Sequence, residues 1–312
     1  MTDEELIRMY MLMHGHNLGV KVLEYNENLV NLGVLLASNQ EYEKCKLNCK
    51  YIKPRLILRD CRTFLREKLV LHRIPYADEK ILKDKIDGKI IRNESDLVRL
   101  YNSIGHQIDP FDLPVKFEAQ PYYYGNVSLL VNLSDDEEFL KKMKIFFKSI
   151  ELSNKTNCMT GVCYVHEIMH TQVESIKGIV GDFYNGELLS IFMELLYADE
   201  KDKDLFGLSI KNRIDLFFYE FYSWYLYINN NEGKNSDRFR YLISCKYIVS
   251  SLKAFHLYSR YLEESEIGKS NILWMIQNVI SGITSLEEML KKLDISYENS
   301  LNEEYVLKLI RK

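Results

Sequence analysis

"YVHEIMHTQVE", residues 164 to 174, lies near the middle of the chain and holds two histidines four positions apart. Apolar residues recur around them at helical spacing, so the stretch predicts an α-helix. On a helix, His166 and His170 lie about 40° apart around the axis, on one face. Glu167 follows the first histidine directly. The stretch therefore predicts a helix that presents two imidazoles together, with a carboxylate beside them.

The bulk composition predicts a mainly helical protein. The chain has 312 residues, of which 46% are hydrophobic and 28% charged, and it contains only 5 prolines and 14 glycines. Few helix breakers combined with long amphipathic stretches favour helices. The formal net charge of −4 gives no reason to expect nucleic acid or an anionic membrane as a partner.

The sequence also predicts where the protein is found. The N-terminal stretch is acidic and lacks the basic-then-apolar pattern of a secretion signal. A run of about 18 apolar residues, which a transmembrane helix requires, does not occur in the sequence. The six cysteines, at positions 45, 49, 61, 158, 163 and 245, are scattered. We therefore expect reduced thiols and a cytoplasmic protein without a membrane span.

A change of composition near residue 115 divides the chain into a helical N-terminal region, 1–114, and a second region, 115–312. The first is expected to serve as a lid or a docking module. Partial alternation over 115–133 predicts two short strands joined at "YYYGN". Elsewhere apolar residues recur at helical spacing, and helices are predicted over 135–152, 158–177, 185–199, 208–229, 236–264, 269–280 and 285–293. The predicted fold is mainly α, a helical domain with a small β-sheet near residues 115–133.

The histidine pair is suited to a metal ion. Two imidazoles on one helix face can share a tetrahedral Zn²⁺, and Glu167 can reach a water bound to that metal. This is the His-Glu-x-x-His pattern of the zincin class of zinc hydrolases, and it makes the predicted helical domain zincin-like. The competing explanation is a buried helix whose polar residues fall into this spacing by chance.

A zinc hydrolase needs a third protein ligand. Two glycines after the first helix allow the chain to turn back, and a second helix is predicted to begin near Asn185. Glu187 lies in its first turn and is the preferred ligand. Glu194, two turns further, is either a partner of a ligand or a rival ligand, and Asp182 and Glu174 are weaker rivals.

The sequence resembles a known family of metallopeptidases. "HEIMH" followed by "GELLSIFMELL" is similar to the gluzincin class, and more closely to the M3 family of oligoendopeptidases. Glu187, Ser190 and Glu194 match the spacing of the family's second helix. "KYIVSSLKAFHLYSRYLEE" resembles its tyrosine-bearing helix, and "ISGITSLEEMLKKLDIS" its near-terminal segment. The family usually has glycine where Met169 stands.

The resemblance and the motif together imply a mechanism. One Zn²⁺ per chain, held by His166, His170 and Glu187, would activate water, and Glu167 would act as general base. A further donor should stabilise the developing oxyanion. The candidates are Tyr247, by resemblance, and Tyr241, as the nearest preceding tyrosine, with His256 a weaker one.

The expected function is a zinc metallopeptidase that acts on short or unstructured peptides. A strand at 126–133 is expected to offer its edge to an extended substrate. One alternative is a processing protease dedicated to a single protein or peptide partner. Another is a peptide-binding protein that kept the scaffold and lost turnover. The oligomeric state stays open.

Overall fold

The protein is mainly helical. The computed structural model describes residues 23–38, 54–69, 74–75, 107–108, 115–118, 122–124, 149–153, 158–173, 183–229 and 235–312. The helices in these ranges are α2 (Glu27–Ser38), α3 (Pro54–Lys68), α7 (Met159–Val173), α8 (Leu188–Lys201), α9 (Lys203–Asn229), α10 (Asn235–Glu263), α11 (Glu266–Ile280), α12 (Leu286–Lys292) and α13 (Glu303–Arg311). Two short 3-10 turns, η3 (Phe183–Asn185) and η4 (Asn299–Leu301), complete the helical elements.

The described strands form two small sheets. They are β1 (Ile74–Pro75), β2 (Gln107–Ile108), β3 (Val115–Glu118), β4 (Tyr122–Tyr124) and β5 (Ser149–Ser153). β1 pairs with β2. In the second sheet β5 is central, parallel to β3 and antiparallel to β4. The small sheet expected near residue 115 is therefore present.

Two details of the predicted sheet are wrong. Residues 149–152, which were predicted to end a helix, belong to β5, because pairing with strands on both sides overrides the local helical pattern. The "YYYGN" stretch was predicted to join two paired strands, but Tyr122–Tyr124 is itself a strand, and β3 and β4 pair with β5 rather than with each other. The predicted strand at 126–133 lies outside the described residues.

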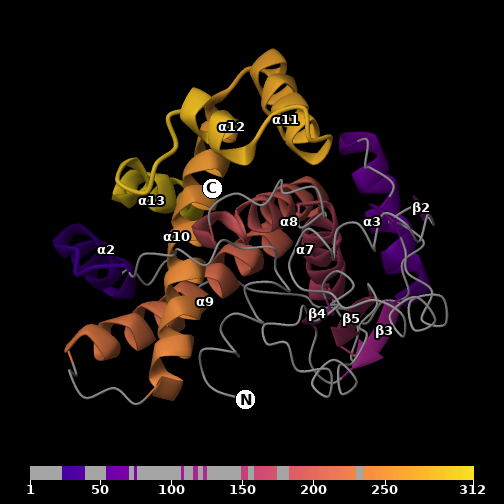
Figure 1. Cartoon of the computed structure of the whole chain (residues 1–312). Helices are drawn as coiled ribbons and strands as arrows, with labels where there is room; N and C mark the ends of the chain where they lie inside the picture. Colours follow the sequence, from indigo (N-terminus) through magenta and orange to yellow (C-terminus); the bar gives the residue numbers. More distant parts are fainter. Residues whose placement is uncertain are drawn as a thin grey trace, which may run out of the picture.

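Helices α7 to α10 form the centre of the molecule. α8 packs against α7, α9 and α10, and every residue from Leu188 to Ala198 is buried. A helix that is apolar on all sides needs such complete cover. Figure 1 shows α7 and α8 side by side, with the long α10 running past them and the small sheet next to α7. α7 and α8 also approach closely, since a Cβ on Gly161 would lie 2.6 Å from the Tyr197 hydroxyl oxygen.

The described N-terminal helices pack on the same core. α3 lies along α7 in Figure 1, and Cys61 Sγ donates to the Gly161 carbonyl at 3.4 Å. Tyr197 in α8 donates to Asp60 in α3 at 2.8 Å. Ahead of α2, the Leu23 carbonyl accepts a hydrogen bond from Trp224 in α9. The division into regions 1–114 and 115–312 stays a prediction.

The C-terminal helices cover one end of α10. α13 was not predicted from the sequence, although Asn302 caps it by accepting a hydrogen bond from the Glu304 backbone at 3.1 Å. Its contact with α10 includes a stacked pair, His256 and Tyr305, with ring centroids 3.8 Å apart. In the described part of the chain, the helices are too short or too polar to cross a membrane.

Candidate metal centre

α7 carries both predicted histidines. His166 and His170 are 7% and 6% exposed, and their Nε2 atoms lie 3.0 Å apart. The rings meet edge to face, with centroids 4.8 Å apart. The four-residue spacing on a regular helix produces this arrangement, and it confirms the helical prediction for the stretch that contains them.

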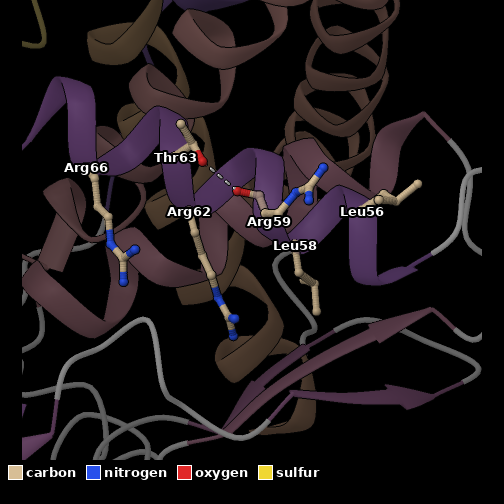
Figure 2. Close-up of a pocket in the computed structure, with 6 residues that line it drawn as sticks. All are labelled: Leu56, Leu58, Arg59, Arg62, Thr63 and Arg66. Carbon is tan, nitrogen blue, oxygen red and sulfur yellow. Dashed lines mark hydrogen bonds between the residues drawn. The ribbon is translucent and has the colours of Figure 1, made fainter.

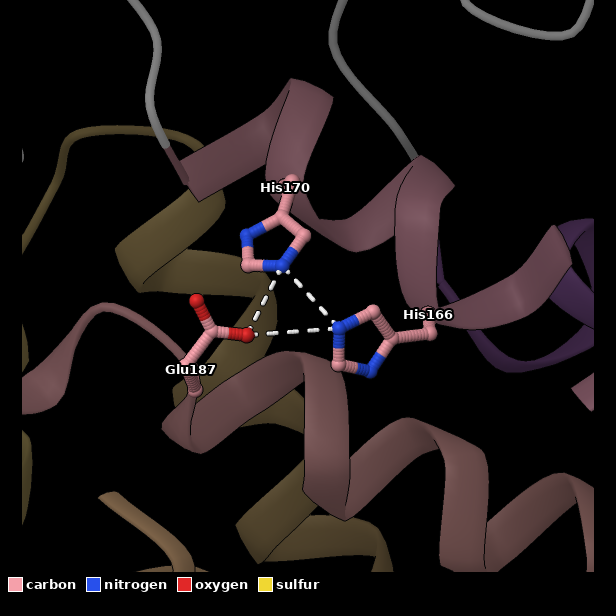
Figure 3. Close-up of side chains that lie close together, drawn as sticks. All are labelled: His166, His170 and Glu187. Carbon is pink, nitrogen blue, oxygen red and sulfur yellow. Dashed lines mark hydrogen bonds and ion pairs between the residues drawn. The ribbon is translucent and has the colours of Figure 1, made fainter. Parts of the chain in front are cut away.

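Glu187 reaches the histidines from the start of the next helix. It is the N-cap residue of α8 and is 3% exposed. Its Oε2 atom lies 3.3 Å from Nε2 of His166 and 3.1 Å from Nε2 of His170. Figure 3 shows this oxygen pointing between the two rings. Among the residues that the structure describes, these three form the one group of histidine, cysteine and acidic side chains close enough to share a metal ion.

The three donor atoms fit a zinc ion. With zinc–ligand bonds of about 2.0–2.1 Å, the edge of a coordination tetrahedron is about 3.3 Å, and the three separations here are 3.0, 3.1 and 3.3 Å. Oε2 of Glu187 is buried without a hydrogen bond in the described structure, and a buried carboxylate oxygen normally has a partner. A set of two imidazoles and one carboxylate is also a donor set that Zn²⁺ accepts in catalytic sites.

α10 fixes the turn that presents Glu187. The Ser250 hydroxyl accepts a hydrogen bond from the Glu187 backbone N–H at 3.2 Å and donates to the Tyr184 carbonyl at 2.6 Å. One turn further along α10, Lys253 Nζ donates to Asn185 Oδ1 at 2.9 Å. The ligand is therefore held by a helix that is distant in sequence.

Glu194 lies behind the first histidine. Its Oε2 atom is 3.3 Å from Nδ1 of His166, and its Oε1 accepts from the Ser209 hydroxyl at 2.8 Å. Arg213 Nε donates to Oε2 at 2.8 Å. A carboxylate on the far nitrogen of a metal-binding histidine fixes the tautomer and the ring orientation. Of the two roles considered for Glu194, this geometry favours the partner over the rival ligand.

Two contacts of His166 Nδ1 exclude each other. Arg213 Nη2 lies 3.0 Å away, but a guanidinium only donates, so this hydrogen bond requires an unprotonated Nδ1. The contact with Glu194 requires a protonated Nδ1. When Nε2 binds a metal, the proton of a neutral imidazole is on Nδ1, so the Glu194 hydrogen bond is the one compatible with metal binding.

A second buried cation, Lys246, contacts the site. Its Nζ atom lies 2.7 Å from Oε1 of Glu187, and the residue is 1% exposed. Sequence reasoning missed Arg213 and Lys246, because each reaches the site from a separate helix. The sequence offered only a basic residue within a predicted helix, which identifies no partner.

Burial and paired charges set the pKa values of the site. Burial raises the pKa of the Glu187 carboxyl, but the charge of Lys246 and the histidines outweigh it and hold this pKa well below its usual range. Burial also raises the pKa of Glu194, yet the Arg213 guanidinium brings it down to about 2. For His166, burial and the Arg213 charge lower the pKa, whereas Glu187, Glu194 and Glu167 raise it, with a net value of about 9.

The remaining predicted residues are placed as follows. Glu167 is half-buried on α7, and its charge contributes to the raised pKa of His166. The ring of Tyr247 lies 5.9 Å from Nζ of its neighbour Lys246, and Tyr247 contributes to the raised pKa of Arg213. The hydroxyl of Tyr241 instead donates to the Leu23 carbonyl at 2.5 Å.

His256 lies in the core at the α10–α13 contact, and its Nδ1 is 3.1 Å from the Ser300 hydroxyl. Glu174 and Asp182 lie outside the described residues.

A separate cavity of about 580 Å³ lies along α3. It is lined by Leu56, Leu58, Arg59, Arg62, Thr63 and Arg66. Figure 2 shows Arg62 and Arg66 directed to the same side of the helix. Arg62 Nε also donates to the Tyr164 hydroxyl of α7 at 3.3 Å. None of the three metal-ligand candidates lines this cavity.

Comparisons with known proteins add little to these observations. No family model matches the sequence, and a search of curated proteins finds no match. A search of solved structures finds the crystal structure of "a putative oligoendopeptidase F" from Bacillus anthracis str. Ames, with a TM-score of 0.42 and 14% sequence identity over 97% of this chain. This chain spans 56% of the length of that protein. At this TM-score the likeness does not by itself establish a shared fold.

Proposed function

We propose that this chain is a zinc-dependent metallopeptidase that hydrolyses short or unstructured peptides. The observation that carries the proposal is the convergence of three buried donor atoms, Nε2 of His166, Nε2 of His170 and Oε2 of Glu187, within 3.3 Å of one another. The two histidines belong to a His-Glu-x-x-His sequence, and such a helix combined with a carboxylate from a second helix is typical of zinc peptidases.

The chain's own residues have separate roles in this proposal. When bound, Zn²⁺ would supply Lewis acidity, which lowers the pKa of a water molecule to about 7 and polarises the scissile carbonyl. Glu167 accepts the proton of the attacking water and passes it to the leaving amine. Tyr247 donates a hydrogen bond to the oxygen that becomes negative during attack. Glu194 holds the His166 ring through Nδ1.

We also propose a cytoplasmic location and one zinc ion per chain. Cys61, Cys163 and Cys245 form no disulfide bond in the described structure, as expected for a protein in a reducing compartment. The metal content of the purified protein, measured by elemental analysis, tests the stoichiometry.

The decisive experiment compares the wild type with Glu167→Gln on a mixed pool of peptides, with products identified by mass spectrometry. The variant keeps both histidines and Glu187, so we expect full zinc content together with a loss of cleavage of about 10²–10⁴-fold. Normal turnover by Glu167→Gln would refute the mechanism.

The cleavage pattern separates the alternative functions. Cleavage of many short peptides by the wild type indicates a general oligopeptidase. Cleavage confined to one partner sequence indicates a dedicated processing protease. Zinc binding and peptide binding without cleavage, unchanged by Glu167→Gln, would indicate a binding protein.

A further inference from the structure

Lys246 is a buried cation to which the proposed mechanism gives no role. It lies in α10, is 1% exposed, and its Nζ atom is 2.7 Å from Oε1 of Glu187. Transfer of an ammonium group from water into a protein interior is costly unless an opposite charge compensates it. The Lys246–Glu187 pair therefore stabilises both members, and one of the two is a candidate metal ligand.

We propose that Lys246 is a positioning residue of the metal site: it occupies one oxygen of Glu187, and its charge limits how tightly the site holds a divalent cation. The inference rests on the proposed zinc site. With Oε1 paired to Lys246, only Oε2 faces the two histidine Nε2 atoms, at 3.3 and 3.1 Å. Glu187 is thus presented as a ligand through one oxygen.

The same face of α10 also contacts the backbone of Glu187. Lys246, Ser250 and Lys253 are spaced by four and three residues, so they share one face of the helix. Ser250 accepts a hydrogen bond from the Glu187 backbone, and Lys253 donates to Asn185. Neither of these hydrogen bonds reaches the Glu187 carboxylate. What Lys246 adds to them is a full positive charge on the ligand carboxylate.

The two buried carboxylates that face the histidines each have a cation beside them before a metal enters: Glu187 is paired with Lys246, and Glu194 is paired with Arg213. A divalent cation then adds a double positive charge a few ångströms from Lys246, and like charges at that range repel strongly in a buried site. Lys246 therefore stabilises the metal-free protein and weakens the binding of a divalent cation.

The test uses the full chain with Lys246→Met, which keeps the length of the side chain and removes its charge. Zinc affinity is measured by competition with a chelator, and the thermal unfolding midpoint is measured with and without zinc. We expect zinc to bind about tenfold more tightly or better, because the repulsion is gone and the metal now neutralises Glu187. We expect a lower midpoint without zinc and a larger increase on adding zinc.

Lys253→Met is the matched comparison. It removes a buried lysine from the same helix face, but the partner of that lysine is the neutral Asn185 side chain. We expect Lys253→Met to bind zinc no more tightly than the wild type, because the charge beside Glu187 remains while a hydrogen bond that holds the η3–α8 turn is lost. General damage to α10 would weaken metal binding. Such damage therefore cannot explain tighter zinc binding that occurs in Lys246→Met and not in Lys253→Met. Unchanged or weaker binding by Lys246→Met, or equal shifts in both variants, would overturn the inference.

A metal-free measurement tests the pair independently. Lys246→Met leaves the Glu187 carboxylate buried without its cation, whereas Lys246→Met combined with Glu187→Gln removes both charges. We expect the double variant to recover most of the midpoint lost by the single variant. If the double variant recovered none of the lost midpoint, the result would contradict the pairing of Lys246 with Glu187. A Lys246→Met variant that could not fold even with zinc would contradict the inference that its charge opposes the metal. A wild type that binds no zinc would instead refute the proposed function.

Discussion

Three glutamates of the same chemical type have different electrostatic settings around the histidine pair. Glu187 is buried beside Lys246 and turns one oxygen to both Nε2 atoms. Glu194 is buried beside Arg213 and faces the outer nitrogen of His166. Glu167 is half-buried on the histidine helix. These settings support the roles proposed for the three carboxylates: metal ligand for Glu187, partner of a ligand for Glu194 and proton acceptor for Glu167.

Glu187→Gln and Glu194→Gln form a matched pair that tests this assignment. Glu187→Gln should lose most of the bound zinc, because an amide oxygen is a poor ligand for this metal. Glu194→Gln should keep the ligands and weaken zinc binding by about 10–100-fold, since it disturbs only the orientation of His166. Elemental analysis and chelator competition measure both. Full zinc retention by Glu187→Gln would move the third ligand to another carboxylate.

We expect the two candidate tyrosines to differ in their effect on activity. Tyr247→Phe should lower kcat by about 10²–10³-fold with unchanged zinc content, as expected for loss of one oxyanion donor. Tyr241→Phe should leave kcat close to normal and lower the free energy of unfolding by about 1 kcal/mol, because its hydroxyl donates to the Leu23 carbonyl. Steady-state kinetics and denaturant unfolding check the pair, and the reverse pattern would assign the oxyanion role to Tyr241.

At the scale of elements, α10 organises the site although it carries no metal ligand. It fixes the η3–α8 turn through Ser250 and Lys253, and it supplies Lys246. Its other end packs against α13. We therefore expect substitutions near one end of α10 to affect the metal site and substitutions near the other end to affect the packing of the C-terminal helices.

The α10–α13 contact predicts a pH dependence of stability. Burial and the nearby Arg260 lower the pKa of His256 to about 4, against the weaker opposing charges of Asp294 and Glu263. The fold thus favours the neutral ring, which stacks on Tyr305. Because the folded pKa lies below the ordinary value of about 6.5, this stability is fully present above about pH 6.5 and is lost as the pH falls toward 4.

His256→Phe is the matched control for this prediction, since it keeps an aromatic ring and does not titrate. Between about pH 7.5 and 4.5, the metal-free wild type should lose about 2 kcal/mol more free energy of unfolding than the variant. Denaturant unfolding at the two pH values measures the difference. Equal losses would show that His256 does not couple protonation to folding.

At the scale of the whole molecule, segments far apart in sequence share one core. The Leu23 carbonyl accepts hydrogen bonds from Trp224 and Tyr241, which lie more than 200 residues further along the chain. Asp60 accepts from Tyr197 and Lys201 of α8. The described N-terminal helices therefore support the same helices that carry the metal-site candidates.

The sequence predicted most of the described helices after residue 158, because each has a long apolar periodicity. It failed where pairing or packing outweighs local pattern. β5 is a strand because it lies between β3 and β4. α13 has only nine residues, and a helix of that length depends on its contact with α10.

What the sequence by itself determined is the local part of the site. A four-residue spacing on a helix places His166 and His170 together whatever surrounds them. For the third ligand the sequence favoured Glu187 and left other carboxylates as rivals. Only the tertiary structure decided how the Glu187 carboxylate is oriented and which charges lie beside it. Lys246 and Ser250 contact Glu187 from α10, and Arg213 contacts Glu194 from α9. Periodicity encodes which residues share a helix face, but the contacts between faces form only when the helices pack.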